Sequence, residues 1–365
     1  MAQRWRIFRH AFERCTGYRL TRRGLWFLAA LAATAAGAVV SANNLLFLVM
    51  AAMLGMLLVS GLLGSLSLAG LEVDFEAPEH VFAGRIFAGQ MRVRNVKWLL
   101  PSFSIRVEGI RSEQGARFES AVYFPLIPPG TTLEKSAEAR FARRGAYREN
   151  GFAFSTSFPF GFLRRTARVT LLRETLVYPP LHPLPGFEEM LPAIAEEMES
   201  YYRGLGRDFY RIRPYEALES ARHVDWKATA HVGSLQVREF AREQEQTVEL
   251  FLDRDVPPQL DDWFEHAVHC CAFLAWRLSG RGASVHFRSN GYSLRQPEEG
   301  DIYAILRYLA LVYPQRSATV EGPAEETTYK LVFTASAERL RQAGWMEARI
   351  LSPEELPAPA EGRAS

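Results

Sequence analysis

The sequence predicts a chain that begins with a two-helix transmembrane hairpin, continues as a β-sandwich and ends as an α/β domain with a mostly parallel sheet. Three observations lead to this fold class. No Asp, Glu, Lys, Arg or His occurs between Gly24 and Leu71. Residues 71–178 contain short runs in which apolar and polar residues alternate, as they do in strands with one buried face. From Thr247 onward, short apolar runs alternate with segments of helical length and period.

The apolar region predicts two spanning helices, residues 25–41 and 45–66, within a hairpin of residues 24–70. A helix needs about 20 apolar residues to cross the hydrocarbon core of a bilayer. Asn43 and Asn44 separate the runs and mark the turn, because asparagine is costly in lipid and favourable in turns. The second run also contains small residues that allow close packing against the first helix: Gly55, Gly61 and Gly64.

Charge predicts the orientation of the hairpin. The basic segment before it, residues 1–23, has seven arginines opposed only by Glu13. The positive-inside rule places this end in the cytoplasm, and a hairpin returns the chain to the same side. We therefore expect a multi-pass protein of the inner membrane whose soluble region is cytoplasmic. The alternative is a signal peptide cleaved near Ser41 and Ala42; the long basic segment and the second apolar run favour the hairpin.

Residues 71–178 predict the β-sandwich. About seven alternating runs occur over some 100 residues, the count and spacing of a small two-sheet fold. Pro128-Pro129-Gly130 and Asn150-Gly151 separate runs and are typical turn sequences. A proline-rich stretch, residues 179–185, ends the region.

The last predicted domain spans residues 247–352. Its alternating strands and helices are typical of a parallel sheet with helical crossovers. The predicted strands are 248–252, 283–287, 329–333 and 345–350, and the predicted helices are 261–279, 301–312 and 337–342. The region before it, 179–246, contains a predicted helix over 188–202. The tail, 353–365, is rich in Pro, Ala and Glu and is expected to be disordered.

Composition excludes several classes of protein. The net charge of +2 gives no bulk affinity for nucleic acid, and three cysteines make no disulfide framework. No Gly-x-Ser-x-Gly elbow is present, and adjacent Cys270 and Cys271 lie in an amphipathic helix, which is a poor place for a reactive thiol. Asp262, His266 and His269 near Cys270 have helical spacings but do not converge as metal ligands.

Residues 204–240 carry a long pattern of glycines, aromatics and charges. The residues that form the pattern are Gly204, Gly206, Asp208, Phe209, Arg213, Tyr215, Arg222, Asp225, Trp226, Lys227, Ala230, Gly233, Leu235, Glu239 and Phe240. With Phe158-Pro159-Phe160-Gly161 and the Asn43-Asn44 turn, this pattern resembles the "domain of unknown function 58" family of bacterial membrane proteins. Leu218-Glu219 replaces the family's usual Gly-Asp, and His231 its usual Arg.

The resemblance implies a function. Members of this family are often associated with AAA+ ATPases of the MoxR type and with transglutaminase-like membrane proteins, so an adaptor or assembly factor at the bilayer is expected. No cofactor is implied. The rival expectation is a membrane-associated enzyme of hydrolase type, which needs a converging acid, base and nucleophile. The sequence does not display such a set.

The centre of the pattern is the predicted partner-binding site or structural hub: Arg213, Tyr215, Arg222, Asp225, Trp226 and Lys227. As a hub it would join the two soluble domains, with Trp226 as a buried anchor. Basic and aromatic residues alternate here as in nucleic-acid-binding segments. The acidic residues among them favour ion pairing between domains, or a face for a partner or lipid headgroups.

The resemblance also implies that the α/β domain is similar to a von Willebrand factor A domain. Many such domains bind Mg²⁺ through Asp-x-Ser-x-Ser after the first strand, because Mg²⁺ prefers hard oxygen ligands. The matching residues here are Asp253 and Asp255, followed by Pro257, which has no side-chain ligand. We therefore expect a degenerate site and no bound metal.

Overall fold

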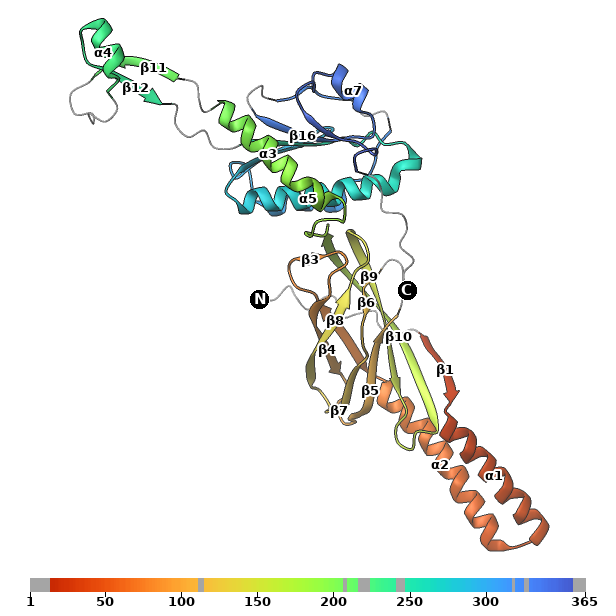
Figure 1. Cartoon of the computed structure of the whole chain (residues 1–365). Coiled ribbons are helices and arrows are strands. Elements are labelled where there is room, and N and C mark those ends of the chain that lie inside the picture. Colours follow the sequence, from red (N-terminus) through yellow and green to blue (C-terminus); the bar gives the residue numbers. More distant parts are fainter. Residues whose placement is uncertain are drawn as a thin grey trace. The chain divides into compact units, whose positions relative to one another are not determined.

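The computed structural model describes residues 14–110, 115–205, 209–215, 224–240, 247–316, 319–324 and 328–356. The chain divides into two compact units, Met1–Tyr178 and Pro179–Ser365, and each is described by itself. Figure 1 shows the helices and strands of both units.

Two consecutive helices form the predicted hairpin. Helices α1 (Arg22–Ser41) and α2 (Asn44–Leu68) are long and apolar enough to cross a membrane. The Thr21 hydroxyl accepts a hydrogen bond from the Gly24 N–H and begins α1, and the Asn43 side chain caps α2 by accepting from the Leu45 N–H. The two asparagines therefore lie at the turn, as predicted.

The hairpin packs against the β body through the loop at 157–162. The Thr21 N–H donates to the Phe162 carbonyl oxygen over 3.0 Å, and the rings of Phe27 and Phe162 stack 4.0 Å apart. The expected role of the α2 glycines is corrected here. Gly61 and Gly64 approach Leu163 and Phe158 of the body rather than α1. These small residues therefore let the strands come close to the helix.

The β body has two sheets. The first has the strand order β1 (Arg14–Leu20), β10 (Leu163–Tyr178), β9 (Gly145–Thr156), β5 (Ser102–Gly109) and β7 (Val122–Ile127), with β3 (Val81–Phe82) beside β10. The second has the order β2 (Leu71–Glu76), β4 (Phe87–Asn95), β8 (Thr132–Arg140) and β6 (Arg117–Phe118). Inward-facing residues of both sheets form one hydrophobic core, including Phe75, Phe124, Phe152 and Phe154. The basic N-terminal segment did not predict β1.

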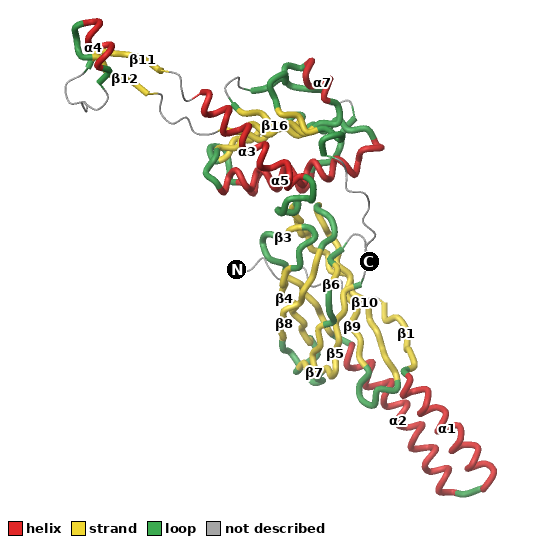
Figure 2. The backbone as a smooth tube through the Cα atoms, in the orientation of Figure 1, coloured by secondary structure: helices red, strands yellow, loops and turns green. Residues whose placement is uncertain are grey.

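A five-stranded sheet organises the second unit. Its strand order is β15 (Tyr292–Gln296), β14 (Ser284–Ser289), β13 (Thr247–Leu252), β16 (Tyr329–Phe333) and β17 (Arg349–Leu351). Only β15 runs antiparallel to its neighbour. The helices are α3 (Phe187–Leu205), α5 (Asp261–Gly280), α6 (Ile302–Leu311) and α7 (Ala337–Gln342), and a 3₁₀ turn spans Pro258–Leu260 (Figure 2).

Three details of the α/β prediction are wrong. Strand β15 was missed, although Asn290-Gly291 before it is a hairpin signal. The last strand begins at Arg349, because Trp345 lies in a turn and is buried against Phe251. The predicted disordered tail begins too early, since residues 353–356 form a turn that buries Leu356. The remainder, 357–365, lies outside the described residues.

The two faces of this sheet differ in chemistry. Val248 and Leu250 of β13 point toward α3 and α5, where they meet apolar side chains. Successive residues of a strand point to opposite faces. Glu249 and Phe251 therefore point to the other face, where Phe251 packs with Leu340 and Trp345.

Candidate functional site

The family pattern folds into a small element of its own. Strands β11 (Phe209–Pro214) and β12 (Gln236–Phe240) pair antiparallel, and α4 (Trp226–Val232) precedes β12. The Tyr215 N–H donates to the Leu235 carbonyl oxygen over 2.9 Å, which extends the pairing by one residue.

Asp225 is the residue that starts α4. Its carboxylate accepts hydrogen bonds from the N–H groups of Lys227 and Ala228 at 2.9 and 3.1 Å. The Asp225 N–H donates to the Gln236 carbonyl oxygen, so the cap is also tied to β12. At the other end Gly233 adopts a φ of +73°, the left-handed conformation that ends many helices. The acid-aromatic-lysine run of the pattern is therefore a helix start.

Trp226 is not the buried anchor that the pattern predicted. Its side chain is 68% exposed, and α4 has no buried residue. Val232 and Leu235, at the far end of the helix, are also exposed apolar residues. Val224 and Gln236 are buried instead and hold the element together. Trp226 thus faces outward from α4.

The other predicted site residues are distributed as follows. Lys227 is exposed and has no ion-pair partner among the described residues, and Tyr215 is partly buried. Arg213 lies in β11, paired with Val237. Arg222 lies outside the described residues, so its place in a hub stays a prediction.

The exposed residues Trp226, Lys227, Val232 and Leu235 of this element are together called the α4 surface below. It combines three exposed apolar side chains with a cation. Aromatic residues are enriched at the centres of protein interfaces, where they contribute most of the binding energy. Its chemistry suits a protein partner with an apolar pocket.

Asp253 and Asp255 lie at the carboxyl end of β13. In the folded protein, the guanidinium of Arg339 lies between their two carboxylates. Arg339 of α7 donates from one nitrogen to Asp253 Oδ2 over 2.5 Å and from the other to an oxygen of Asp255. Asp253 is fully buried and also accepts from the Thr334 hydroxyl (2.8 Å) and the Asp255 N–H (3.1 Å). The guanidinium thus occupies the position that a cation bridging the two carboxylates would take.

These residues do not fit a divalent ion. Mg²⁺ requires a near-octahedral set of oxygen ligands. Both carboxylates are already bound to Arg339, and Pro257 provides no ligand. In place of a metal ion, the guanidinium of Arg339 neutralises the two aspartates.

A second buried ion pair was missed from the sequence. Glu249 in β13 is fully buried and accepts from Arg288 of β14 over 2.8 Å, while Arg288 also reaches Glu321 over 3.0 Å. The signal was present for Glu249, which is the one charged residue in the apolar strand β13. A buried carboxylate without a cation is costly, so the pair holds segment 319–324 over the sheet.

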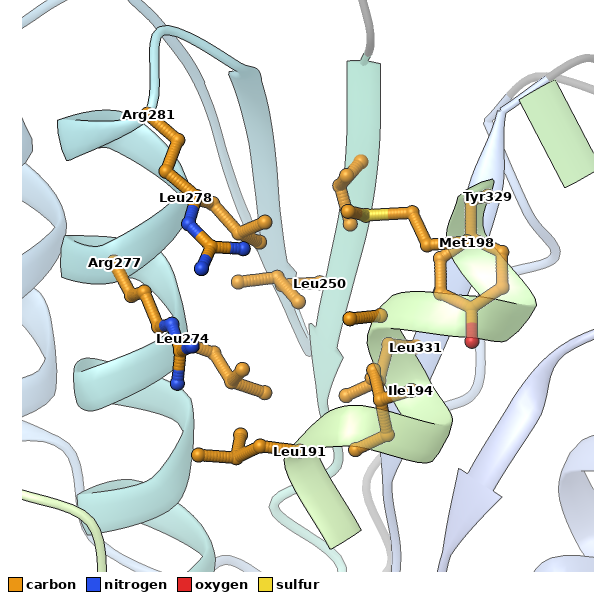
Figure 3. A pocket seen from close by; sticks show the side chains of 12 residues that line it. Leu191, Ile194, Met198, Leu250, Leu274, Arg277, Leu278, Arg281, Tyr329 and Leu331 are labelled. Atoms are coloured by element: carbon orange, nitrogen blue, oxygen red, sulfur yellow. The ribbon is translucent and has the colours of Figure 1, made fainter. Parts of the chain in front are cut away.

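An apolar cavity lies between α3, α5 and the sheet (Figure 3). The space in it that water-sized molecules can occupy is about 30 Å³. Its walls are Leu191, Ile194, Met198, Leu250, Leu274, Leu278 and Leu331, with Tyr329 on β16 and two arginines, Arg277 and Arg281, on the α5 side. None of the predicted site residues lines it.

Burial shifts the pKa of three side chains in the structure. It lowers the pKa of His269 in α5 to about 4; the ring lies within 2.8 Å of the His182 carbonyl oxygen. It also lowers the pKa of Lys97 to about 8, where the amine donates to carbonyl oxygens at the end of α2. Burial raises the pKa of the Cys270 thiol to about 12, which makes it an inert core residue.

Comparison with protein-family models gives a match. Residues 211–331 match the family model described as "Protein of unknown function DUF58". The matched range includes the α4 surface, the two aspartates and the first strands of the five-stranded sheet. No curated protein matches the chain. The resemblance seen in the sequence is therefore confirmed for residues 211–331, which are similar to the DUF58 family.

Proposed function

We propose that this protein is a membrane-anchored adaptor that binds a partner protein through the α4 surface. The observation that carries the proposal is the exposure of Trp226 on a helix whose start and end are both fixed. Asp225 caps the helix, and Gly233 terminates it. A large exposed aromatic on an ordered element, beside two more apolar residues, is characteristic of a protein contact.

The proposed partner is a MoxR-type AAA+ ATPase, together with a transglutaminase-like membrane protein. The family resemblance supports this assignment. In the same proposal the β body is a β-sandwich and the second unit is a von Willebrand factor A-like domain. The hairpin spans the bacterial inner membrane, and the β body and the second unit lie in the cytoplasm. The basic segment before α1 supports this orientation.

The Asp253–Arg339–Asp255 arrangement shapes how such a domain would work. An Mg²⁺ ion held at the end of β13 would offer a partner's carboxylate a binding position, because Mg²⁺ prefers oxygen ligands. With an internal guanidinium in that position, recognition does not depend on a metal. Partner binding is therefore assigned to the α4 surface and not to the end of β13.

The test is recovery of the ATPase from cell membranes by the tagged, detergent-solubilised full chain. Trp226→Ala and Leu235→Ser are expected to lose the ATPase and to unfold at the wild-type temperature, because both side chains are exposed. Met346→Ala is the matched control, since Met346 is 77% exposed in the same unit but lies away from α4 in the chain. Wild-type recovery by both variants would rule out the α4 surface as the docking site.

Lys227→Ala separates docking from internal ion pairing. If the lysine contacts a partner, the variant keeps its thermal stability and recovers less ATPase. If it belongs to an internal network, the variant melts earlier, because a broken buried pair leaves one charge unpaired. Its exposure favours the first result.

A further inference from the structure

One loop of the β body exposes a continuous apolar surface. It connects β4 to β5 and contains Val96, Trp98, Leu99 and Leu100, all of them exposed. Trp98 is 90% exposed and Leu99 72%. Single exposed apolar residues are ordinary, but a contiguous group marks a surface that is covered in use.

The loop is fixed beside the end of α2. The Val96 N–H donates to the Gly70 carbonyl oxygen over 2.8 Å. The Lys97 amine donates to the Leu66 carbonyl oxygen over 2.6 Å and to the Ser102 hydroxyl over 2.7 Å. A cation at the end of a helix neutralises carbonyl groups that have no partner within the helix. The apolar side chains of the loop are thereby held at the level where α2 ends.

A second loop reaches the same end of the body. Phe160 in the 157–162 loop is exposed, and Phe162 stacks on Phe27 near the start of α1. The adjoining Arg22 and Arg23 are exposed. Aromatic and basic residues gather where spanning helices leave the hydrocarbon core, because an aromatic ring suits the headgroup layer and a cation pairs with phosphate.

We propose that residues 96–100 insert into the lipid interface beside α2 and act as a third anchor that holds the β body against the bilayer. This rests on the proposed spanning of the membrane by the hairpin. Lipid is the occupant, because the loop is hydrogen-bonded to the end of α2, whose first four turns are apolar and mostly exposed. A protein partner would have to share this position with the lipid headgroups.

The test uses the full chain in lipid nanodiscs, with one cysteine at a time labelled by a fluorophore sensitive to its surroundings. Cys15→Ser provides the background, since Cys270 and Cys271 are buried and free. Leu99→Cys reports on the loop. Leu172→Cys is the matched control: Leu172 is 62% exposed in β10, about 30 Å along the strand from Leu163 at the membrane end. Leu58→Cys reports on α2 itself.

Two quenchers are applied: a lipid with a nitroxide near its headgroup, and aqueous iodide. We expect the nitroxide lipid to quench the label at 99 but not at 172. The iodide quenching constant of the label at 99 should be at most roughly one third of the constant at 172, because the bilayer excludes the ion. If iodide quenches the labels at 99 and 172 equally while the nitroxide lipid quenches the label at 58, the hairpin is in the membrane and the loop is not. This result overturns the proposed loop anchor alone. A label at 58 that lipid nitroxide does not reach overturns the membrane anchorage as well.

Discussion

Replacing Arg339 with alanine tests how the two aspartates at the end of β13 are neutralised. Asp253 is fully buried, and the change removes its only described cation. Breaking a buried ion pair costs about 3–5 kcal/mol, because the remaining charge stays unpaired in a poorly solvated position. The Arg339 side chain is 28% exposed, so water can partly replace it. We therefore expect the lower end of that range, about 3 kcal/mol.

This loss corresponds to a fall in melting temperature of about 6–12 °C for a unit of this size, because 1 kcal/mol shifts it by about 2–4 °C. The assay is calorimetry of the detergent-solubilised full chain. Arg341→Ala is the control on the same helix: its side chain is more exposed and, among the residues that the structure describes, pairs only with Glu338, a surface contact worth at most about 1 kcal/mol. Equal melting temperatures for the two variants would refute the internal-cation account. So would a Mg²⁺-dependent rise in the wild-type melting temperature that Asp253→Ala abolishes.

Three further predictions concern other parts of the chain. Burial keeps His269 neutral in the fold, with a pKa of about 4, whereas in the unfolded chain this side chain takes up a proton below about pH 6.5. The free energy of unfolding should therefore fall by up to about 3 kcal/mol between pH 6.5 and pH 4. His269→Gln should reduce this pH dependence, as measured by denaturant titrations. Gly24→Ala should loosen the hairpin from the β body, because the new Cβ would lie 2.1 Å from a backbone oxygen of the body. Gly37→Ala is the control: its Cβ meets only ordinary contacts, so the change should be neutral or stabilising. Limited proteolysis of the full chain compares the two variants. Reporter fusions at Arg6 and Ala364 should both report the cytoplasm, and a periplasmic signal at Ala364 would contradict the hairpin topology.

Local patterns predicted much of the secondary structure. The two apolar runs became α1 and α2, and the period-two runs became strands whose apolar residues line one core, because both signals reflect burial of one face of a regular element. The missed strand β15 has only five residues, Tyr292–Gln296, so its alternation of apolar and polar side chains is too short to distinguish it from a loop.

The candidate site was harder to predict than the fold. The sequence pattern identified Asp225, Trp226 and Lys227, but it did not show that the first caps a helix and that the second faces outward. An aromatic between charged residues fits a core anchor and a docking residue equally well. The pairing of Asp253 with Arg339 joins residues 86 positions apart, and only the folded sheet brings α7 to the end of β13.

The most direct test of the adaptor account is the affinity of the purified MoxR-type ATPase for the full chain in nanodiscs, measured by titration calorimetry for the wild type, Trp226→Ala and Met346→Ala. A central interface aromatic contributes about 2 kcal/mol or more, so the account predicts a dissociation constant at least about 30-fold weaker for Trp226→Ala and an unchanged one for Met346→Ala. Binding of equal strength by all three proteins, or no binding by the wild type, would contradict it.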